Sequence, residues 1–218
     1  MTKKRNIYIV LAVMMASLLG ITGYYWYNNT YYVKTEDARL EGTIARVSPQ
    51  ASGKIISIYV GEGDRVVSGQ AIARLDDTAL QAGANPDLAV ARAPMDGIII
   101  KKIGNIGEMA APGQPLVMML DPYSLYVSVN VEETKLKPVR PGQKVDVSVD
   151  AIPGVVFPGR VERIGEASLS TFSILPSGNT SGSFTKVVQR IPVRVAIDDF
   201  KGYQIPYGAN AYVKIHIK

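Results

Sequence analysis

Residues 53–77, GKIISIYVGEGDRVVSGQAIARLDD, and residues 97–121, GIIIKKIGNIGEMAAPGQPLVMMLD, are two copies of one pattern set 44 positions apart. Each copy begins with a glycine and a β-rich run, passes a second glycine beside an acid, and reaches a Gly-Gln pair before another apolar run. Glycine allows positive φ and close backbone approach at turns. Two complementary half-motifs predict a small flattened β-sandwich. The matched turn glycines are Gly53, Gly63 and Gly69, and Gly97, Gly107 and Gly113.

The chain beyond residue 27 favours strands almost throughout. Short β-branched runs that often alternate with polar residues predict strands over 54–60, 98–103, 125–131, 144–149 and 212–217. Pro-Gly pairs between several of these runs indicate turns. Only 132–139 has the character of a helical turn. The segment 168–183 is rich in Ser, Thr, Gly and Asn and predicts a long exposed loop.

The composition argues against several functions. The formal charge is +5, but Lys3, Lys4 and Arg5 carry three of those charges and leave +2 for the rest, so a nucleic-acid groove is not expected. The absence of cysteine excludes disulfides, a thiolate metal site and a nucleophilic cysteine. The single histidine, His216, alternates with isoleucines in a predicted strand and cannot form a catalytic site alone. We therefore expect no enzyme activity, no metal and no cofactor.

The start of the chain predicts a membrane anchor. Residues 7–27 carry no charge, and 21 helical residues span about 31 Å, close to the thickness of a bilayer's hydrocarbon core. A cleaved signal peptide is the alternative, but its apolar part is usually shorter and ends in small residues. Cations precede the segment and aromatic residues end it, as at the two membrane interfaces. These predicted interface anchors are Lys3, Lys4 and Arg5, and Tyr24, Tyr25, Trp26 and Tyr27.

Longer stretches resemble a known family. VSPQASGKIISIYVGEGDRVVSGQAIARLDD (47–77) and ARAPMDGIIIKKIGNIGEMAAPGQPLVMMLD (91–121) resemble the two halves of the biotinyl/lipoyl-type domain of HlyD/EmrA-type membrane fusion proteins, the periplasmic adaptors. Residues 35–38 resemble that family's lead-in strand, and 129–164 resemble its β-barrel. TFSILPSGNTSGSFTKVVQRIPVRV (171–195) resembles a stretch of the EmrA-like branch. Its matching residues, which also form a possible partner-facing loop, are Phe172, Leu175, Pro176, Phe184, Lys186, Gln189 and Arg190.

The resemblance implies a mainly β fold. It has an N-terminal transmembrane helix, a lipoyl/biotinyl-like β-sandwich, also called a barrel-sandwich hybrid, and a β-barrel domain. The expected divisions are a cytoplasmic tail (1–6), the transmembrane helix (7–27), a linker with the lead-in strand (28–43), the lipoyl-like domain (44–121) and the barrel (122–218). The lipoyl-like domain divides into halves 44–77 and 91–121 with a short connector, 78–90.

The same resemblance implies a structural role in a multidrug efflux or secretion system. The chain would be a single-pass protein of the bacterial inner membrane, with its N-terminus in the cytoplasm and its bulk in the periplasm or outside. It would pair with an inner-membrane exporter, for the EmrA-like branch a major-facilitator drug pump, and form a homo-oligomer that lines the export path. The surfaces predicted to face the pump are the aromatic anchors and the loop 168–190, for which an inert excursion is the structural alternative.

One departure from the family bears on the outer partner. Relatives usually carry a long α-helical hairpin between the two halves and reach an outer-membrane channel through it, whereas here only 77–91 connects them, so that contact is in doubt. The short connector fits a natural hairpin-less adaptor or a shortened relative. Two other functions stay open. A lipoyl or biotinyl carrier module needs a lysine at the hairpin, and 76–93 has none. The third hypothesis is an envelope scaffold protein that works without a pump.

Overall fold

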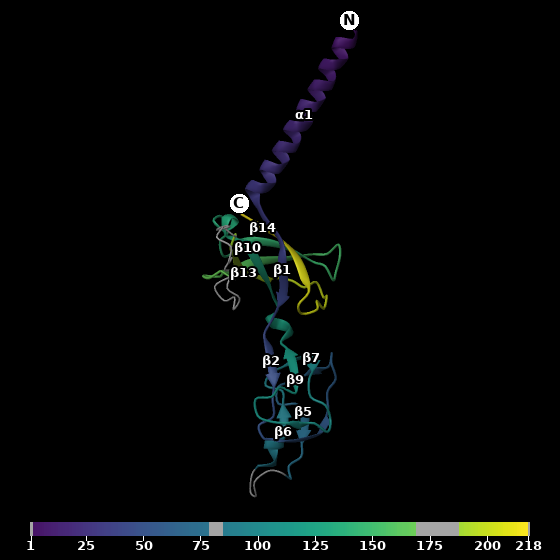
Figure 1. Ribbon diagram of the computed structural model, residues 1–218, viewed down its shortest axis with the longest axis vertical. Coiled ribbons are helices and arrows are strands. Elements are labelled where there is room, and N and C mark those ends of the chain that lie inside the picture. The colour runs from purple at the N-terminus through teal and green to yellow at the C-terminus, as the bar shows by residue number, and fades with distance from the viewer. Residues whose placement is uncertain (1, 79–84, 169–187, 218) are drawn as a thin grey trace, which may run out of the picture. The chain divides into compact units, whose positions relative to one another are not determined.

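The computed structural model describes residues 2–78, 85–168 and 188–217, with the backbone alone at 2–10 and 12. Contacts divide the chain into two units, residues 41–125 and the remainder. The fold is mainly β, with a sandwich and a closed barrel, as the sequence predicts. Figure 1 shows the first strand following directly from the N-terminal helix.

The helix α1 runs from Thr2 to Tyr31. It is longer at its end than expected, because 28–31, predicted as part of a linker, form its last turn. Ile217 N–H donates to Tyr31 O at 3.0 Å, which gives one carbonyl of that turn a partner. Among the described residues, no helix has both the length and the hydropathy that crossing a bilayer requires. The membrane-spanning role predicted for 7–27 stays a prediction.

The barrel closes around a core of alternating side chains. Val127, Val129 and Val131 point inward from one strand and are at most 1% exposed, and Phe157 is the largest side chain that is fully buried. This period of two places apolar residues inside and polar residues outside. The six strands, in spatial order, are β1 (Tyr32–Glu41), β10 (Tyr126–Glu132), β13 (Arg190–Ile197), β12 (Val156–Ile164), β11 (Lys144–Val149) and β14 (Asn210–His216).

One short helix, α2 (Glu133–Leu136), follows β10 within the region where the sequence predicts a helical turn. The strands predicted over 125–131 and 144–149 agree with β10 and β11 to within one residue at each end. The end of β14 is His216, one residue before the predicted end.

The sandwich contains two four-stranded sheets. The first is ordered β2 (Ile44–Val47), β9 (Val117–Leu120), β7 (Gly97–Lys102) and β4 (Arg65–Val66). The second is ordered β6 (Val90–Arg92), β5 (Ala71–Leu75), β3 (Gly53–Ile58) and β8 (Met109–Ala110). Each sheet therefore mixes strands of both sequence halves, in equivalent order.

The internal repeat is visible in individual hydrogen bonds. Gly63 N–H donates to Ile99 O at 2.8 Å, and Gly107 N–H donates to Ile55 O at the same distance. The two glycine donors are 44 positions apart in the sequence, and so are the two isoleucine acceptors. The two halves thus complete each other's sheets, and neither half forms a sheet of this order alone.

The connector between the halves is short. β5 ends at Leu75 and β6 begins at Val90, preceded by the 3-10 helix η1 (Pro86–Ala89). Asn85 caps η1 by accepting a hydrogen bond from Asp87 N–H at 2.9 Å through its side-chain oxygen. A second 3-10 helix, η2 (Pro122–Ser124), follows β9.

Candidate partner-binding surfaces

The turn glycines have structural reasons for their identity. Gly63 and Gly107 have φ of +91° and +93°, and Gly69 and Gly113 have φ of +81° and +84°. An L-residue rarely adopts this left-handed conformation, so glycine is favoured there. Their role is therefore to form the turns that close the two half-motifs.

Gly53 and Gly97 serve a different purpose from the other four glycines. A Cβ at Gly53 would lie 2.8 Å from Asp76 O, and one at Gly97 would lie 2.7 Å from Leu120 O. Both glycines therefore allow the close approach of a neighbouring strand.

The predicted aromatic anchors form an exposed ring at the end of α1. Tyr24, Tyr25, Trp26 and Tyr27 are each 51–69% exposed. The Tyr27 ring lies 4.5 Å from the Tyr31 ring, so the aromatic surface continues to the last residue of the helix. The side chains of Lys3, Lys4 and Arg5 lie outside the described residues. Large aromatic side chains that are exposed on a surface suit an interface with a membrane or a protein.

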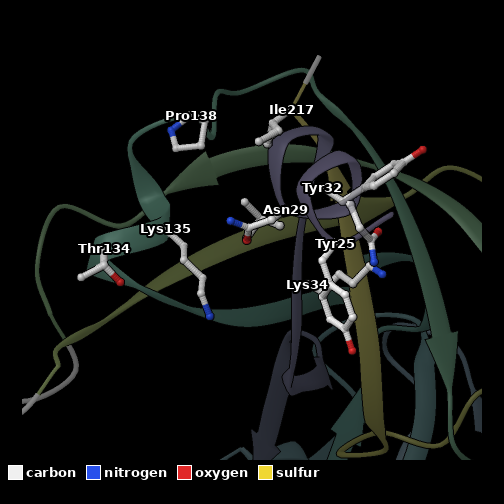
Figure 2. Close-up of a pocket in the computed structure, with 10 residues that line it drawn as sticks. Tyr25, Asn29, Tyr32, Lys34, Thr134, Lys135, Pro138 and Ile217 are labelled. Atoms are coloured by element: carbon white, nitrogen blue, oxygen red, sulfur yellow. The ribbon is translucent and has the colours of Figure 1, made fainter. Parts of the chain in front are cut away.

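A pocket of about 340 Å³ lies where the end of α1 meets the barrel (Figure 2). Its size is at the lower end of the range for small-molecule sites. Figure 2 shows the Asn29 side chain pointing from α1 toward Lys135, with Lys34 and Tyr25 on its other side. The lining consists of Tyr25, Asn28 and Asn29 of α1, Tyr32, Val33 and Lys34 of β1, Thr134, Lys135 and Pro138 at and after α2, and Ile217.

The structure joins two motifs that are far apart in sequence. β1 is irregular between Thr35 and Ala38, and Asp37 there forms an ion pair with Arg190 at the start of β13. Asn130 Nδ2 also donates to Asp37 at 3.0 Å. The lead-in motif 35–38 is thereby bonded to the described end of the EmrA-like stretch, a contact that sequence reasoning did not predict.

Charged groups around this ion pair border an open groove of about 680 Å³. Glu132 lies 2.8 Å from Lys135, whose hydrogen bond lowers the pKa of the Glu132 carboxyl. Burial, with a smaller effect from Glu36, raises the pKa of Tyr212. Cationic and anionic side chains both line the groove, so it suits a partner with charged and hydrogen-bonding groups.

The other predicted residues of the EmrA-like stretch, Phe172, Leu175, Pro176, Phe184 and Lys186, lie outside the described residues. Gln189 and Arg190 are described. Gln189 O accepts a hydrogen bond from Glu133 N–H at 2.9 Å, which ties this end of the stretch to α2.

The sandwich has two unlike edges, although its halves are related by the repeat. Glu62 and Arg65 beside β4 are replaced at the equivalent positions by Ile106 and Met109 beside β8. Ile106 is 66% exposed and Met109 is 67% exposed. The β8 edge therefore exposes two apolar side chains where the β4 edge has two charged ones, a difference visible in the sequence once the copies are aligned.

The single histidine contacts one acidic residue and one aromatic ring. His216 Nε2 lies 2.8 Å from Asp146 Oδ2, and the ring of His216 packs edge-on against Tyr32 at 5.1 Å. His216 thus faces outward from the barrel, in a polar and aromatic contact. Within the described ranges, no group of three His, Cys, Asp or Glu side chains could hold a metal ion.

Both β units of the chain match known protein families. The family described as "RND MFP, barrel-sandwich hybrid domain" matches residues 43–122, and the "AAEA-like beta-barrel domain" family matches residues 124–216. The putative efflux system component YhbJ of Bacillus subtilis (strain 168) is 36% identical over 86% of this chain and 80% of its own length. The chain belongs to the membrane fusion protein family, of the EmrA type.

Other relatives are matched over a smaller part of their length. The colistin resistance protein EmrA of Acinetobacter baumannii is 44% identical over 44% of this chain and 29% of its own length. The probable multidrug resistance protein EmrK of Escherichia coli (strain K12) is 38% identical over 49% of this chain and 28% of its own length.

A solved structure supports the fold. The structure of the periplasmic adaptor protein EmrA has a TM-score of 0.59 at 18% identity and covers 85% of this chain and 98% of its own. At that identity the likeness concerns the fold alone.

Proposed function

We propose that this protein is a membrane-anchored adaptor that joins an inner-membrane exporter, a pump of the major-facilitator class, in the export of drugs or other small molecules. Its role is structural: it forms part of the export path and transports nothing itself. The single observation that carries the proposal is the pairing of an exposed apolar, aromatic-ended helix with the adaptor sandwich and barrel in one chain.

The surface of α1 supports anchoring. Its large apolar side chains from Leu11 to Ile21 that are described are 57–67% exposed, and they occur on all sides of the helix. A helix that is apolar all round is favoured only where water is excluded, as in a bilayer. We therefore place residues 7–27 in the inner membrane, with Lys3, Lys4 and Arg5 in the cytoplasm and the two β units outside.

We further propose two pump-facing surfaces, the aromatic anchors and the loop 168–190. The first lies at the membrane in this arrangement. At the second, Arg190 is held by Asp37, so one end of the loop starts from a fixed point on the barrel. The names of the relatives, which include a multidrug export protein EmrA of Escherichia coli (strain K12), support an exporter as partner.

A homo-oligomer is the third part of the proposal. The apolar edge at Ile106 and Met109 and the charged edge at Glu62 and Arg65 are different surfaces of one sandwich. A contact between unlike surfaces of identical chains is heterologous, and such contacts form rings when the rotation closes. Burial of the two apolar side chains would stabilise this contact.

Site-specific photo-crosslinking tests the exporter partnership. A photoreactive residue at Trp26, which is 69% exposed, is expected to capture a membrane protein with many spans in the native bacterium. The matched control is the same residue at Tyr203, an aromatic position on the barrel that is 47% exposed. Capture at Trp26 but not at Tyr203 supports the proposal. If Trp26 captures no membrane protein reproducibly, the scaffold function, without a pump, is favoured instead.

A further inference from the structure

We infer that the pocket between the end of α1 and the barrel binds an anionic phosphodiester headgroup, the polar part of an acidic membrane lipid. The inference rests on the proposed anchoring, because a lipid reaches this pocket only if α1 stands in the bilayer. The ligand class follows from the charges, the hydrogen-bond donors and the apolar surface of the pocket.

The end of α1 beside the barrel presents a polar face. Tyr25, Asn28 and Asn29 follow the spacing of three and four residues that places side chains on one side of a helix. Within the described part of the chain, neither asparagine side chain has a hydrogen-bond partner in the protein. Each carboxamide therefore has two N–H donors free for a ligand.

Two ammonium groups complete the set of donors. Lys34 and Lys135 line the pocket, and none of its lining residues is acidic. Lys135 Nζ is 2.8 Å from Glu132, but an ammonium has three hydrogens and keeps two for another acceptor. The carboxyl end of α1 adds about half a negative charge, which is less than the charge of either lysine. The lining as a whole thus favours an anion.

The strand register gives an independent sign of an anion site. Lys34 of β1 lies directly opposite Lys214 of β14. Like charges directly opposite in a sheet destabilise it. Lys214 Nζ lies 3.9 Å from the centre of the Tyr32 ring, a wall of the same pocket. Asp146, directly opposite Lys214 on its other side, lies 2.8 Å from His216 and offsets only part of this repulsion, because it does not face Lys34. A bound anion would relieve the repulsion between Lys34 and Lys214.

The remaining walls fit a lipid better than a free inorganic anion. Val33 is buried, and Pro138, Ile217 and the Tyr32 ring add apolar surface beside the cations. Tyr25 belongs to the aromatic anchors, which in the proposed arrangement lie at headgroup depth. A headgroup in the pocket would leave its acyl chains beside the apolar surface of α1. Lysines at such a surface each strengthen binding to anionic lipid about fivefold.

Native mass spectrometry of the full chain in detergent tests the inference. The protein is offered equal amounts of phosphatidylglycerol and phosphatidylcholine, and the ratio of retained lipids is measured. We expect the wild type to prefer phosphatidylglycerol and the Lys34→Gln/Lys135→Gln variant to lose roughly 25-fold of that preference. The matched control is Lys101→Gln/Lys144→Gln, which removes the same charge at two exposed strand positions elsewhere.

Equal retention of both lipids by the wild type, or the same loss in the control variant, would overturn the inference. Glycerophosphate, which has no acyl chains, distinguishes the source of the anion. Competition by glycerophosphate at concentrations equal to the lipid would identify a site for free phosphoesters and overturn the lipid assignment. Unchanged hydrogen exchange in β1, β7 and β14 verifies that both variants are folded.

The exporter proposal is tested on the same variants by crosslinking from Trp26. If capture persists without a headgroup preference, the inference is wrong and the partnership stands. If the headgroup preference is found without capture, the partnership is wrong and the pocket assignment stands.

Discussion

Replacement of Gly97 by alanine tests whether close strand approach, rather than turn conformation, requires glycine at the start of β7. The new Cβ would lie 2.7 Å from Leu120 O and 2.9 Å from the Met119 methyl carbon, whereas ordinary contacts begin at 3.4 Å. Strand β9 must therefore move by about 0.7 Å, the difference between the two distances. Met119 is completely buried, so the sandwich core moves with the strand.

The magnitude follows from two opposing effects. Overpacking of a closely packed core costs about 1–3 kcal/mol. The reduced freedom of the unfolded chain on replacing glycine returns about 0.4–1 kcal/mol. We expect a net loss of about 1–2 kcal/mol in the free energy of opening the β7–β9 pair, which accelerates amide exchange there about fivefold to thirtyfold.

Hydrogen exchange with mass spectrometry on the full chain is the suitable assay, because it reports on β7 and β9 separately from the barrel. Gly53→Ala, the equivalent change in the other half, is expected to act alike through Asp76 O at 2.8 Å. Gly61→Ala is the matched control, since its Cβ would meet only an Asp64 carboxylate oxygen at 3.6 Å. If Gly97→Ala exchanges no faster in β7 and β9 than Gly61→Ala, the close-approach argument is refuted.

Two further predictions concern exposed polar contacts. Glu108 accepts hydrogen bonds from Asn105, which lower the pKa of its carboxyl, so its stabilisation of the turn is complete above the ordinary value of 4.5 and is lost as the pH falls below it. Protection of the 105–108 amides should decline over that range, and Glu108→Gln should remove this pH dependence. Arg190→Gln breaks a half-exposed ion pair with Asp37 and is expected to lower barrel stability by no more than about 1 kcal/mol in thermal unfolding. A much larger loss than in Arg160→Gln, which breaks a similar exposed pair, would contradict that reading.

The sandwich was predictable because its constraints are local. The tight turns at Gly63 and Gly107 require positive φ, and turns favour particular residue types at neighbouring positions. The repeat then indicates that the two halves are equivalent, which restricts the sheet order. The strands of the barrel were predictable for a similar reason, since alternation along β10 and β11 records which side chains point inward, whereas their closure into a barrel was expected only from the family resemblance.

The contacts between distant segments were not predictable in the same way. Asp37 and Arg190 are 153 residues apart, and no local pattern marks either as the partner of the other. Lys34 and Lys135 both line the pocket, but they belong to different elements and reach the same pocket only when the barrel closes. The extension of α1 to Tyr31 was missed because asparagines usually indicate turns, whereas here contact with residue 217 after β14 supports the last helical turn.

The place of β1 in the barrel has a mechanical consequence. β1 begins at the residue after α1 ends, and it lies between β14 and β10 in the closed barrel. Antiparallel hydrogen bonds run perpendicular to their strands. A force transmitted along the chain from the helix therefore shears the β1–β14 bonds together instead of peeling them apart one by one. In the proposed arrangement, in which α1 is held in the membrane beside an exporter, the whole ladder of β1–β14 bonds would therefore resist such a force at once.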